Sequence, residues 1–414
     1  MSSPRSTPLP LIGEYAVRIR TFSPNARRYL IGTFLMGIAH GAVWVHLNLY
    51  FQAIGLGEET IGRILSSQSF GTVLMALPAA LLIDRYPARH VFGAAAVGYS
   101  LAIAGFVLVP DARYLPFVAM LAGSAFTTHW AAAAPFFMRN SDSQERLYLF
   151  GFAHAIETTA TIIAAIGVGW TAGVLGARLG GTETGLRVAF LIVAGLSLTA
   201  VWPFRAIEGP PGHGGRRLRD YLAARNWGLI GKLVLPSALV GLGAGLIIPF
   251  LNLYFRERFH QDPLQIGTYF AVSQAFTVLG FLLGPMVARR AGIIVTVVAT
   301  ELASIPFFLL LAFSKWLGPS VVAFWMRGAL MNMNHPLQTN FAMEVVEADQ
   351  QAVTNSLRML GWNLSWMIST QVGGWVIERR GFTLPMLITI GLYAIAAVVT
   401  FLFWRDRRTL GRAT

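Results

Sequence analysis

The chain has 414 residues, of which 55% are hydrophobic and only 12% are charged. That balance is too apolar for an ordinary soluble protein, in which about 25% of the residues are charged. The lack of cysteine excludes disulfides, thiolate metal sites and a thiol nucleophile. The formal net charge of +13 would suit nucleic acid, but the arginines lie between long apolar runs, so we expect no nucleic-acid partner.

Long apolar runs divide the chain from end to end. A helix needs about 20 apolar residues to cross the hydrocarbon core of a bilayer, and the runs reach this length. In lipid the backbone must satisfy its own hydrogen bonds, so each run is predicted to be a helix. The twelve predicted spans are residues 28–52, 61–83, 90–109, 114–138, 147–175, 186–206, 228–254, 265–288, 292–314, 318–343, 352–378 and 384–404.

The most polar long connection, residues 207–227, falls between the sixth and seventh predicted spans. Its proline, glycine and arginine residues predict a cytoplasmic linker between an N-terminal six-helix bundle, residues 28–206, and a C-terminal six-helix bundle, residues 228–404. Residues 1–27 and 405–414 are predicted to be tails. The first apolar run is too long for the core of a signal peptide, so we interpret it as a retained span.

Arginines are concentrated on one side of the predicted spans. The two tails and the loops after even-numbered spans contain most of them, and the other loops contain far fewer. Because lysine and arginine in short loops stay in the cytoplasm, we predict that both termini and the linker are cytoplasmic. This indicates a multi-pass protein of the inner or plasma membrane, with a secondary attraction to anionic membrane lipids.

The pentapeptide Leu-Asn-Leu-Tyr-Phe occurs twice, at residues 47–51 and again at residues 251–255. An Ile-Gly pair follows each copy, at residues 61–62 and at residues 266–267. Each half then continues through a long apolar run, with a glutamine near its start, to a short loop with arginine. The same order in both halves indicates a duplication in parallel orientation.

The loop after the second span is the most specific local motif. It reads "ALLIDRYPAR", and its charged residues are Asp84, Arg85 and Arg89. The matching stretch of the second half reads "GPMVARRAG". That stretch keeps the basic Arg289, but Ala288 stands where the first half has its acid.

Twelve spans, two parallel halves, a basic linker and these loops resemble the major facilitator superfamily. The resemblance implies an all-α membrane protein with twelve transmembrane helices in two parallel six-helix repeats. It also implies a secondary active transporter that works by alternating access. In that family the loop acid caps a helix of the opposite half, and a carboxylate at a helix N-terminus gains about 0.3–1 kcal/mol. The implied gating residues are Asp84, Arg85, Arg89 and Arg289; ordinary solvated loop charges are the alternative.

Ionisable residues inside the predicted spans are candidate functional residues, because each costs at least about 2.5 kcal/mol to insert. Glu157 and His154 are three apart on span five and share one face, and His129 on span four has a similar depth. Burial disfavours a charged carboxylate, and an imidazole can relay its proton. We predict that these three residues couple transport to protons. Structural hydrogen bonds are an equal alternative, and a metal site, lacking a second carboxylate, is a weaker one.

Arg327 on predicted span ten stays charged and therefore needs an anion. Glu301 on span nine is the expected partner, which predicts a structural Glu301–Arg327 ion pair between neighbouring spans. The alternative is that Arg327 faces the cavity and binds an anionic group of the substrate. Both hypotheses remain open at the level of the sequence.

Polar and aromatic residues cluster on predicted spans ten and eleven. Span ten continues from Arg327 as "GALMNMNHPLQTN", and Pro336 is expected to kink it. Interrupted helices near the midplane line many transport sites, and aromatic rings beside amides suit an organic solute with a polar head. Amides that only join helices are the alternative. The predicted substrate-binding residues are Arg327, Asn332, Asn334, His335, Gln338, Asn363, Trp362, Trp366 and His40.

These patterns predict a proton-coupled transporter for a small or amphiphilic organic solute, with an anionic group favoured by Arg327. We expect a monomer without cofactor or metal and, because no nucleophile–base set is evident, no enzyme. A drug/proton antiporter remains an alternative, although the proline-containing motif of span five and the span-four arginine usual in such proteins are missing. A non-transporting membrane sensor or assembly partner with the same fold is another.

Overall fold

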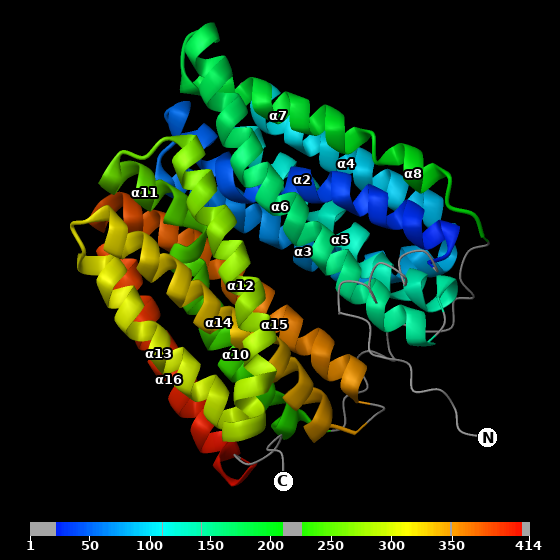
Figure 1. Ribbon diagram of the computed structural model, residues 1–414, viewed down its shortest axis with the longest axis vertical. Helices are drawn as coiled ribbons and strands as arrows, with labels where there is room; N and C mark the ends of the chain where they lie inside the picture. The colour runs from blue at the N-terminus through cyan, green and yellow to red at the C-terminus, as the bar shows by residue number, and fades with distance from the viewer. Residues whose placement is uncertain (1–21, 110, 142, 210–225, 348–349, 408–414) are drawn as a thin grey trace, which may run out of the picture.

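The computed structural model describes residues 22–407 except residues 110, 142, 210–225 and 348–349, and all but a few side chains in those ranges. The described chain forms two helical bundles that lie side by side (Figure 1). The first bundle runs from blue to green in the figure and the second from green to red. Most of the linker predicted at residues 207–227 lies outside the described residues.

The N-terminal bundle holds the first six predicted spans. Its elements are α2 (Pro24–Ala53), α3 (Glu58–Arg85), α4 (Ala88–Leu108), η1 (Ala112–Tyr114), α5 (Leu115–Asn140), α6 (Ser143–Leu179), α7 (Thr182–Leu198) and α8 (Val201–Arg205). The Ser23 hydroxyl caps α2 by accepting a hydrogen bond from the backbone N–H of Ala26 at 3.2 Å. Gly180 and Gly181 have φ angles of 101° and 129° after α6, a region of backbone conformation that favours glycine.

The C-terminal bundle holds the other six. Its elements are α10 (Trp227–Ile247), η2 (Ile248–Phe250), α11 (Leu251–Phe259), α12 (Pro263–Ala291), α13 (Ile293–Phe313), α14 (Leu317–Val345), α15 (Gln351–Arg380), α16 (Thr383–Trp404) and η3 (Arg405–Arg407). Asp262 and Gln265 form a reciprocal capping box at the start of α12, with hydrogen bonds of 2.8 and 2.9 Å.

The long helical segments of the two described bundles correspond to the twelve predicted spans, so the predicted fold class is confirmed. Within the described residues, eight helices are long and apolar enough to cross a membrane by length and composition alone. α3, α5, α14 and α15 are not among these eight.

The two Leu-Asn-Leu-Tyr-Phe copies meet at the contact between the halves. Asn48 donates from Nδ2 to the carbonyl oxygen of Pro249 at 2.6 Å, and Asn252 donates to that of Val45 at 2.8 Å. Both asparagines are buried. The same residue of each copy therefore bonds the same relative position in the other half. We call this pair of reciprocal hydrogen bonds, made by Asn48 and Asn252, the asparagine clasp.

The repeated Ile-Gly pairs lie at a second set of contacts between the halves. A Cβ atom on Gly62 would come 2.8 Å from the carbonyl oxygen of Thr370, where α3 crosses α15. A Cβ atom on Gly267 would collide with the carbonyl oxygen of Ala165, where α12 crosses α6. Both positions need glycine because two backbones approach each other closely.

Polar contacts also join the halves at the end where α2 finishes and α3 begins. Arg379 pairs with Glu59 at 2.8 Å, and Gln52 donates to Glu257 at 2.7 Å. Each hydrogen bond that the structure describes between the halves lies at this end or at the asparagine clasp. The bundles spread apart toward the other end, where α2 begins and α16 finishes (Figure 1).

Candidate substrate cavity

A cavity of about 400 Å³ lies between the two bundles. The N-terminal half supplies His40, Trp44, Glu157, Thr158 and Thr161. The C-terminal half supplies Val240, Ala244, Ile248, Gln274, Thr277, Glu301, Arg327, Met331, Asn332, Asn334, His335, Gln338, Trp362, Trp366 and Tyr393. Every predicted substrate-binding residue except Asn363 is in this lining. The cavity is mixed in character, with indole rings, amides and ionisable groups within one enclosure.

Arg327 is a buried cation on the wall formed by α14. Its residue is 7% exposed, and its Nε and Nη1 atoms have no hydrogen-bond partner among the described residues. The guanidinium carbon lies 5.1 Å from the centre of the Phe308 ring, a cation–π contact. An aromatic face stabilises a cation only in part and does not neutralise it.

Glu301 lines the same cavity but does not pair with Arg327. No ion pair joins these two residues in the part of the chain that the structure describes. The Glu301 Oε1 atom accepts a hydrogen bond from Gln338 at 3.1 Å, and its buried Oε2 atom has no partner. The predicted structural ion pair is therefore absent from this structure. Gln338 holds the carboxyl group, while Arg327 packs against Phe308.

The amides of α14 both join helices and line the cavity. Asn332 donates to the Thr277 hydroxyl on α12 at 3.0 Å. Asn334 accepts a hydrogen bond from the Thr300 hydroxyl on α13. Asn332 and Asn334 therefore contact neighbouring helices and line the cavity at the same time. Pro336 lies inside α14, as the sequence indicates.

An aromatic row crosses the cavity from one half to the other. The rings of Trp44 and Trp366 stack at 6.4 Å, and those of Trp366 and Trp362 at 5.9 Å. Offset stacks of this kind present broad apolar faces to a planar or aliphatic ligand. Asn363 is not part of the wall. Its amide donates to the Met359 carbonyl of its own helix at 2.8 Å, so its predicted binding role is not supported.

Glu157 is the acid that the N-terminal half contributes to the cavity. Its Oε2 atom lies 4.0 Å from the His154 Nδ1 atom, one helical turn away. The His154 ring stacks on Trp130 at 5.0 Å, but the His154 side chain is 68% exposed and is outside the cavity lining. Glu157 and His154 therefore adjoin one another as predicted, with only Glu157 in the wall.

His129 lies away from this pair, in the core of the N-terminal bundle. It is 1% exposed and its Nε2 atom lies 3.3 Å from the Thr33 hydroxyl and 3.4 Å from the Tyr29 hydroxyl. The Tyr29 ring stacks on it at 5.2 Å. His129 does not line the cavity, and its part in proton coupling stays a prediction. The metal alternative also lacks support, because the described residues contain no cluster of three potential ligands.

The predicted gating residues lie at the end where the bundles spread apart. The Asp84 side chain lies outside the described residues. Arg85, Arg89 and Arg289 are exposed, and the Arg85 guanidinium contacts the Tyr86 ring at 5.8 Å. The helix-capping role that the family resemblance implies for Asp84 stays a prediction.

Several cavity residues were not predicted from the sequence. Trp44, Tyr393 and Thr277 line the wall, Trp130 stacks on His154, and Phe308 packs against the Arg327 guanidinium. Gln274, the glutamine near the start of the repeated apolar run in the second half, also lines the wall. Its place near the start of an apolar run was a usable signal, because a lone glutamine within a span indicates an interior face.

The comparisons agree with this architecture. The model of the Major Facilitator Superfamily matches residues 29–347 and also residues 233–414. These matches cover most of the sequence, so the chain belongs to the major facilitator superfamily. No curated protein sequence shows significant similarity to it.

Solved structures of three transporters share the fold. A bacterial homologue of the human lysosomal transporter Spinster, inward-facing and occupied, has 15% identity and a TM-score of 0.78 over 94% of this chain and 98% of its own. The nucleoside transporter NupG has 17% identity and a TM-score of 0.75, covering 93% and 99%. An inward-facing bacterial homologue of the iron transporter ferroportin has 14% identity and a TM-score of 0.71, covering 92% and 98%. Identities this low establish a common fold alone.

Proposed function

We propose that this protein is a secondary active transporter for a small or amphiphilic organic solute that carries an anionic group. The observation that carries the proposal is Arg327, a buried cation with no ion-pair partner among the described residues, in a cavity shared by both halves. A buried charge is costly unless it is paired or hydrogen-bonded. A carboxylate or phosphate of the solute would provide the missing partner. The indole row beside it would pack against the organic body of the solute.

The arrangement of the halves supports alternating access. They are joined at one end by the asparagine clasp and the glycine crossings, and they spread apart at the other (Figure 1). Rocking about these contacts would expose the cavity to each side in turn. We place the spread end on the cytoplasmic side of the inner or plasma membrane, because this end carries most of the arginines. Asp84, Arg85, Arg89 and Arg289 lie at the end that must then close.

Glu157 is the proposed site of proton coupling. It faces the cavity from α6, in a wall otherwise formed mainly by the C-terminal half, and His154 lies one turn away. A carboxyl group in such a place can take up a proton from one side and release it to the other. His154, which is exposed outside the lining, would exchange that proton with water.

The cavity also contains features that suit a cationic drug. Glu157 and Glu301 are its acids, and the tryptophan faces can bind an organic cation. A drug/proton antiporter is thus the second candidate function, and it would leave Arg327 as a helix-packing residue. A sensor of the same fold would bind its ligand without moving it, so flux into liposomes separates that possibility from both.

A thermal-shift measurement on the purified protein tests the proposal. The ligands are benzoate and hexanoate as organic anions, a lysophospholipid as an amphiphile, and tetraphenylphosphonium as a lipophilic cation, each at mildly acidic and neutral pH. A ligand at about 100 times its Kd stabilises the folded state by about 2.7 kcal/mol. We expect an anion to raise the Tm of the wild type and of the Arg380→Gln control, which lacks an exposed arginine. Arg327→Gln should remove most of the rise.

The contrary result is equally clear. If the cation raises the Tm of wild type and Arg327→Gln alike and no anion acts, the substrate class is wrong and the antiporter becomes the better function.

A further inference from the structure

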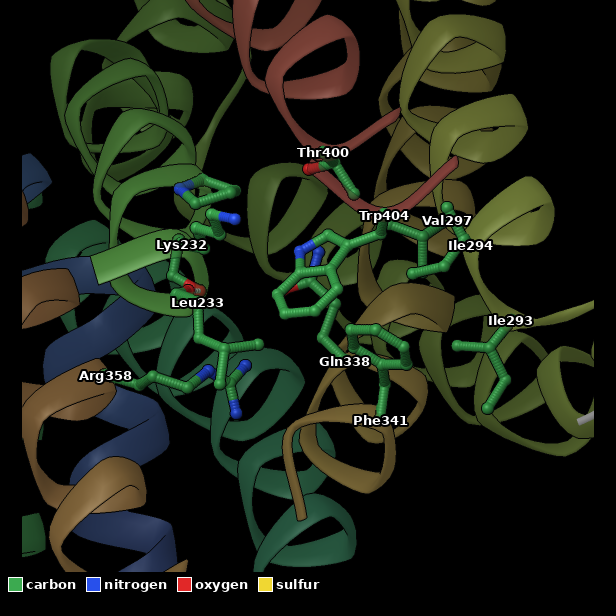
Figure 2. A pocket seen from close by; sticks show the side chains of 12 residues that line it. Lys232, Leu233, Ile293, Ile294, Val297, Gln338, Phe341, Arg358, Thr400 and Trp404 are labelled. Carbon is green, nitrogen blue, oxygen red and sulfur yellow. Dashed lines mark hydrogen bonds between the residues drawn. The ribbon is translucent and has the colours of Figure 1, made fainter. Parts of the chain in front are cut away.

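A second, smaller cavity of about 30 Å³ lies inside the C-terminal bundle, near the end where α10 begins and α16 finishes (Figure 2). Helices α10, α13, α14, α15 and α16 all contribute to it. Its lining residues are Lys232, Leu233, Pro236, Ser237, Ile293, Ile294, Val297, Gln338, Phe341, Arg358, Thr400 and Trp404. None of these is acidic, and two of them are basic.

Arg358 is the principal residue of this pocket. It is 9% exposed, and no hydrogen bond or ion pair reaches its guanidinium among the described residues. Figure 2 shows its side chain extending toward the pocket below Leu233. An arginine cannot be neutralised by losing a proton, so burial leaves a charge that needs an anion.

Other donors surround the same space. The Thr400 hydroxyl is buried and has no hydrogen-bond partner in the described structure. Lys232 is exposed at the rim, with its ammonium group 5.9 Å from the centre of the Phe403 ring. The Trp404 indole, a hydrogen-bond donor, also lines the pocket. Two cations and two neutral donors, with no carboxylate, match the requirements of an anion.

We propose that this pocket is a second anion site, which binds a carboxylate or phosphate group through Arg358 and Lys232. Its small volume admits only the anionic head, so the rest of the ligand must lie outside it. Gln338 lines both this pocket and the central cavity, and therefore connects the two sites. The site extends the proposed function, because it offers an anionic solute a position between Arg327 and the spread end of the molecule.

Isothermal titration calorimetry tests this site directly. The purified full-length protein is titrated with inorganic phosphate and with acetate. Arg358→Gln should weaken the affinity for these anions about tenfold or more, because it removes the buried charge. Arg358→Lys keeps the charge and should retain most of the affinity, which also shows that the site tolerates substitution. Arg380→Gln, on the exposed end of the same helix, is the matched control and should bind like the wild type.

The variants separate this inference from the proposed function. If Arg327→Gln loses organic-anion binding while Arg358→Gln binds phosphate and acetate as wild type does, the second site is refuted and the transport proposal stands. If Arg358→Gln loses phosphate and acetate binding while Arg327→Gln keeps organic-anion binding, the second site is supported and the proposed role of Arg327 is refuted.

Nanodiscs distinguish a dissolved anion from a lipid headgroup as the natural ligand. Discs of phosphatidylglycerol and discs of phosphatidylcholine are compared with the same variants. If anionic discs suppress phosphate binding by the wild type, the pocket is occupied by a lipid phosphate and the anion site is supported. If both kinds of disc leave phosphate binding intact, the ligand is a dissolved anion. Failure of the wild type to bind phosphate or acetate in either setting overturns the proposal.

Discussion

The first helix of each half carries the same five residues, but the two helices are built differently. α2 runs without a break from Pro24 to Ala53, whereas its counterpart is divided into α10, η2 and α11 around Pro249. Proline lacks the backbone N–H that would continue the α-helix. The asparagine bonds are nevertheless equivalent, and Tyr50 and Tyr254 both donate to carbonyl oxygens 57 residues farther along. The two halves therefore share one frame even where their local backbone differs.

The ionisable residues of the halves do not follow this symmetry. The N-terminal half places Glu157 in the cavity, with Trp130 and His154 beside it. The C-terminal half buries Arg327, Arg358 and Glu301, and both arginines lack an ion-pair partner among the described residues. The repeated elements form contacts between the halves, and the unrepeated charges form the proposed site. Function is to be sought where the second half departs from the first.

The largest effect is expected at the glycine crossings, where Gly62 and Gly267 occupy equivalent places in the two halves. Gly267→Ala places a methyl group against the Ala165 carbonyl and should destabilise the joined halves by about 1–3 kcal/mol. Gly62→Ala should act in the same direction at the α3–α15 crossing. The Tm in detergent measures both. Gly391→Ala, where nothing lies within 4 Å of the added atom, is the control. Normal stability of Gly267→Ala would show that the halves do not meet as described.

A large functional effect is expected from Glu157→Gln, which tests whether Glu157 couples transport to protons. An amide resembles the protonated carboxyl group but cannot release a proton. Solute uptake by proteoliposomes should therefore stop responding to an imposed pH gradient, while exchange of solute down its own gradient continues. Uptake by the variant that still follows the pH gradient would remove Glu157 from the coupling mechanism.

A moderate effect is expected at the clasp, where symmetry makes a quantitative prediction. Asn48→Ala and Asn252→Ala should each cost about 1 kcal/mol, the usual contribution of one hydrogen bond. The double variant should cost less than the sum, because the two side chains are in contact at 3.4 Å. Thermal unfolding of the four proteins measures the cycle. Clearly unequal single effects would show that the clasp is not symmetric in energy.

The smallest effect is expected at the exposed ion pair between the halves. Arg379→Ala removes the pair with Glu59, whose side chains are 46% and 31% exposed. Exposed pairs contribute less than about 1 kcal/mol and weaken as salt increases. The Tm difference from the wild type should therefore shrink at high ionic strength. A difference that is large and insensitive to salt would mean that this pair controls closure of the halves.

The sequence could predict the fold because span length and the parallel repeat are properties of the chain itself. It could also predict half of the residues of the cavity wall, because an arginine or an amide inside an apolar span requires a partner. It could not predict side-chain direction. His129 turned into the core of its bundle, Asn363 bonded its own helix, and Glu301 bound Gln338 instead of Arg327.

Arg358 was missed for a related reason. It lies close to one end of a predicted span, where an arginine normally reaches the membrane surface. Only the packing of five helices around its side chain shows that this one is buried. The pairing of Trp44 with Trp366 across the halves likewise depends on tertiary structure.

The most direct test of the central claim is solute flux into proteoliposomes. The solute is the anion that gives the largest thermal shift, and the proteins are the wild type, Arg327→Gln and Arg380→Gln. We expect uptake by the wild type and by the Arg380 control, and a loss of tenfold or more in Arg327→Gln, which is about 1.4 kcal/mol per factor of ten. Equal uptake by all three proteins would contradict this expectation, because it would show that the solute does not need Arg327.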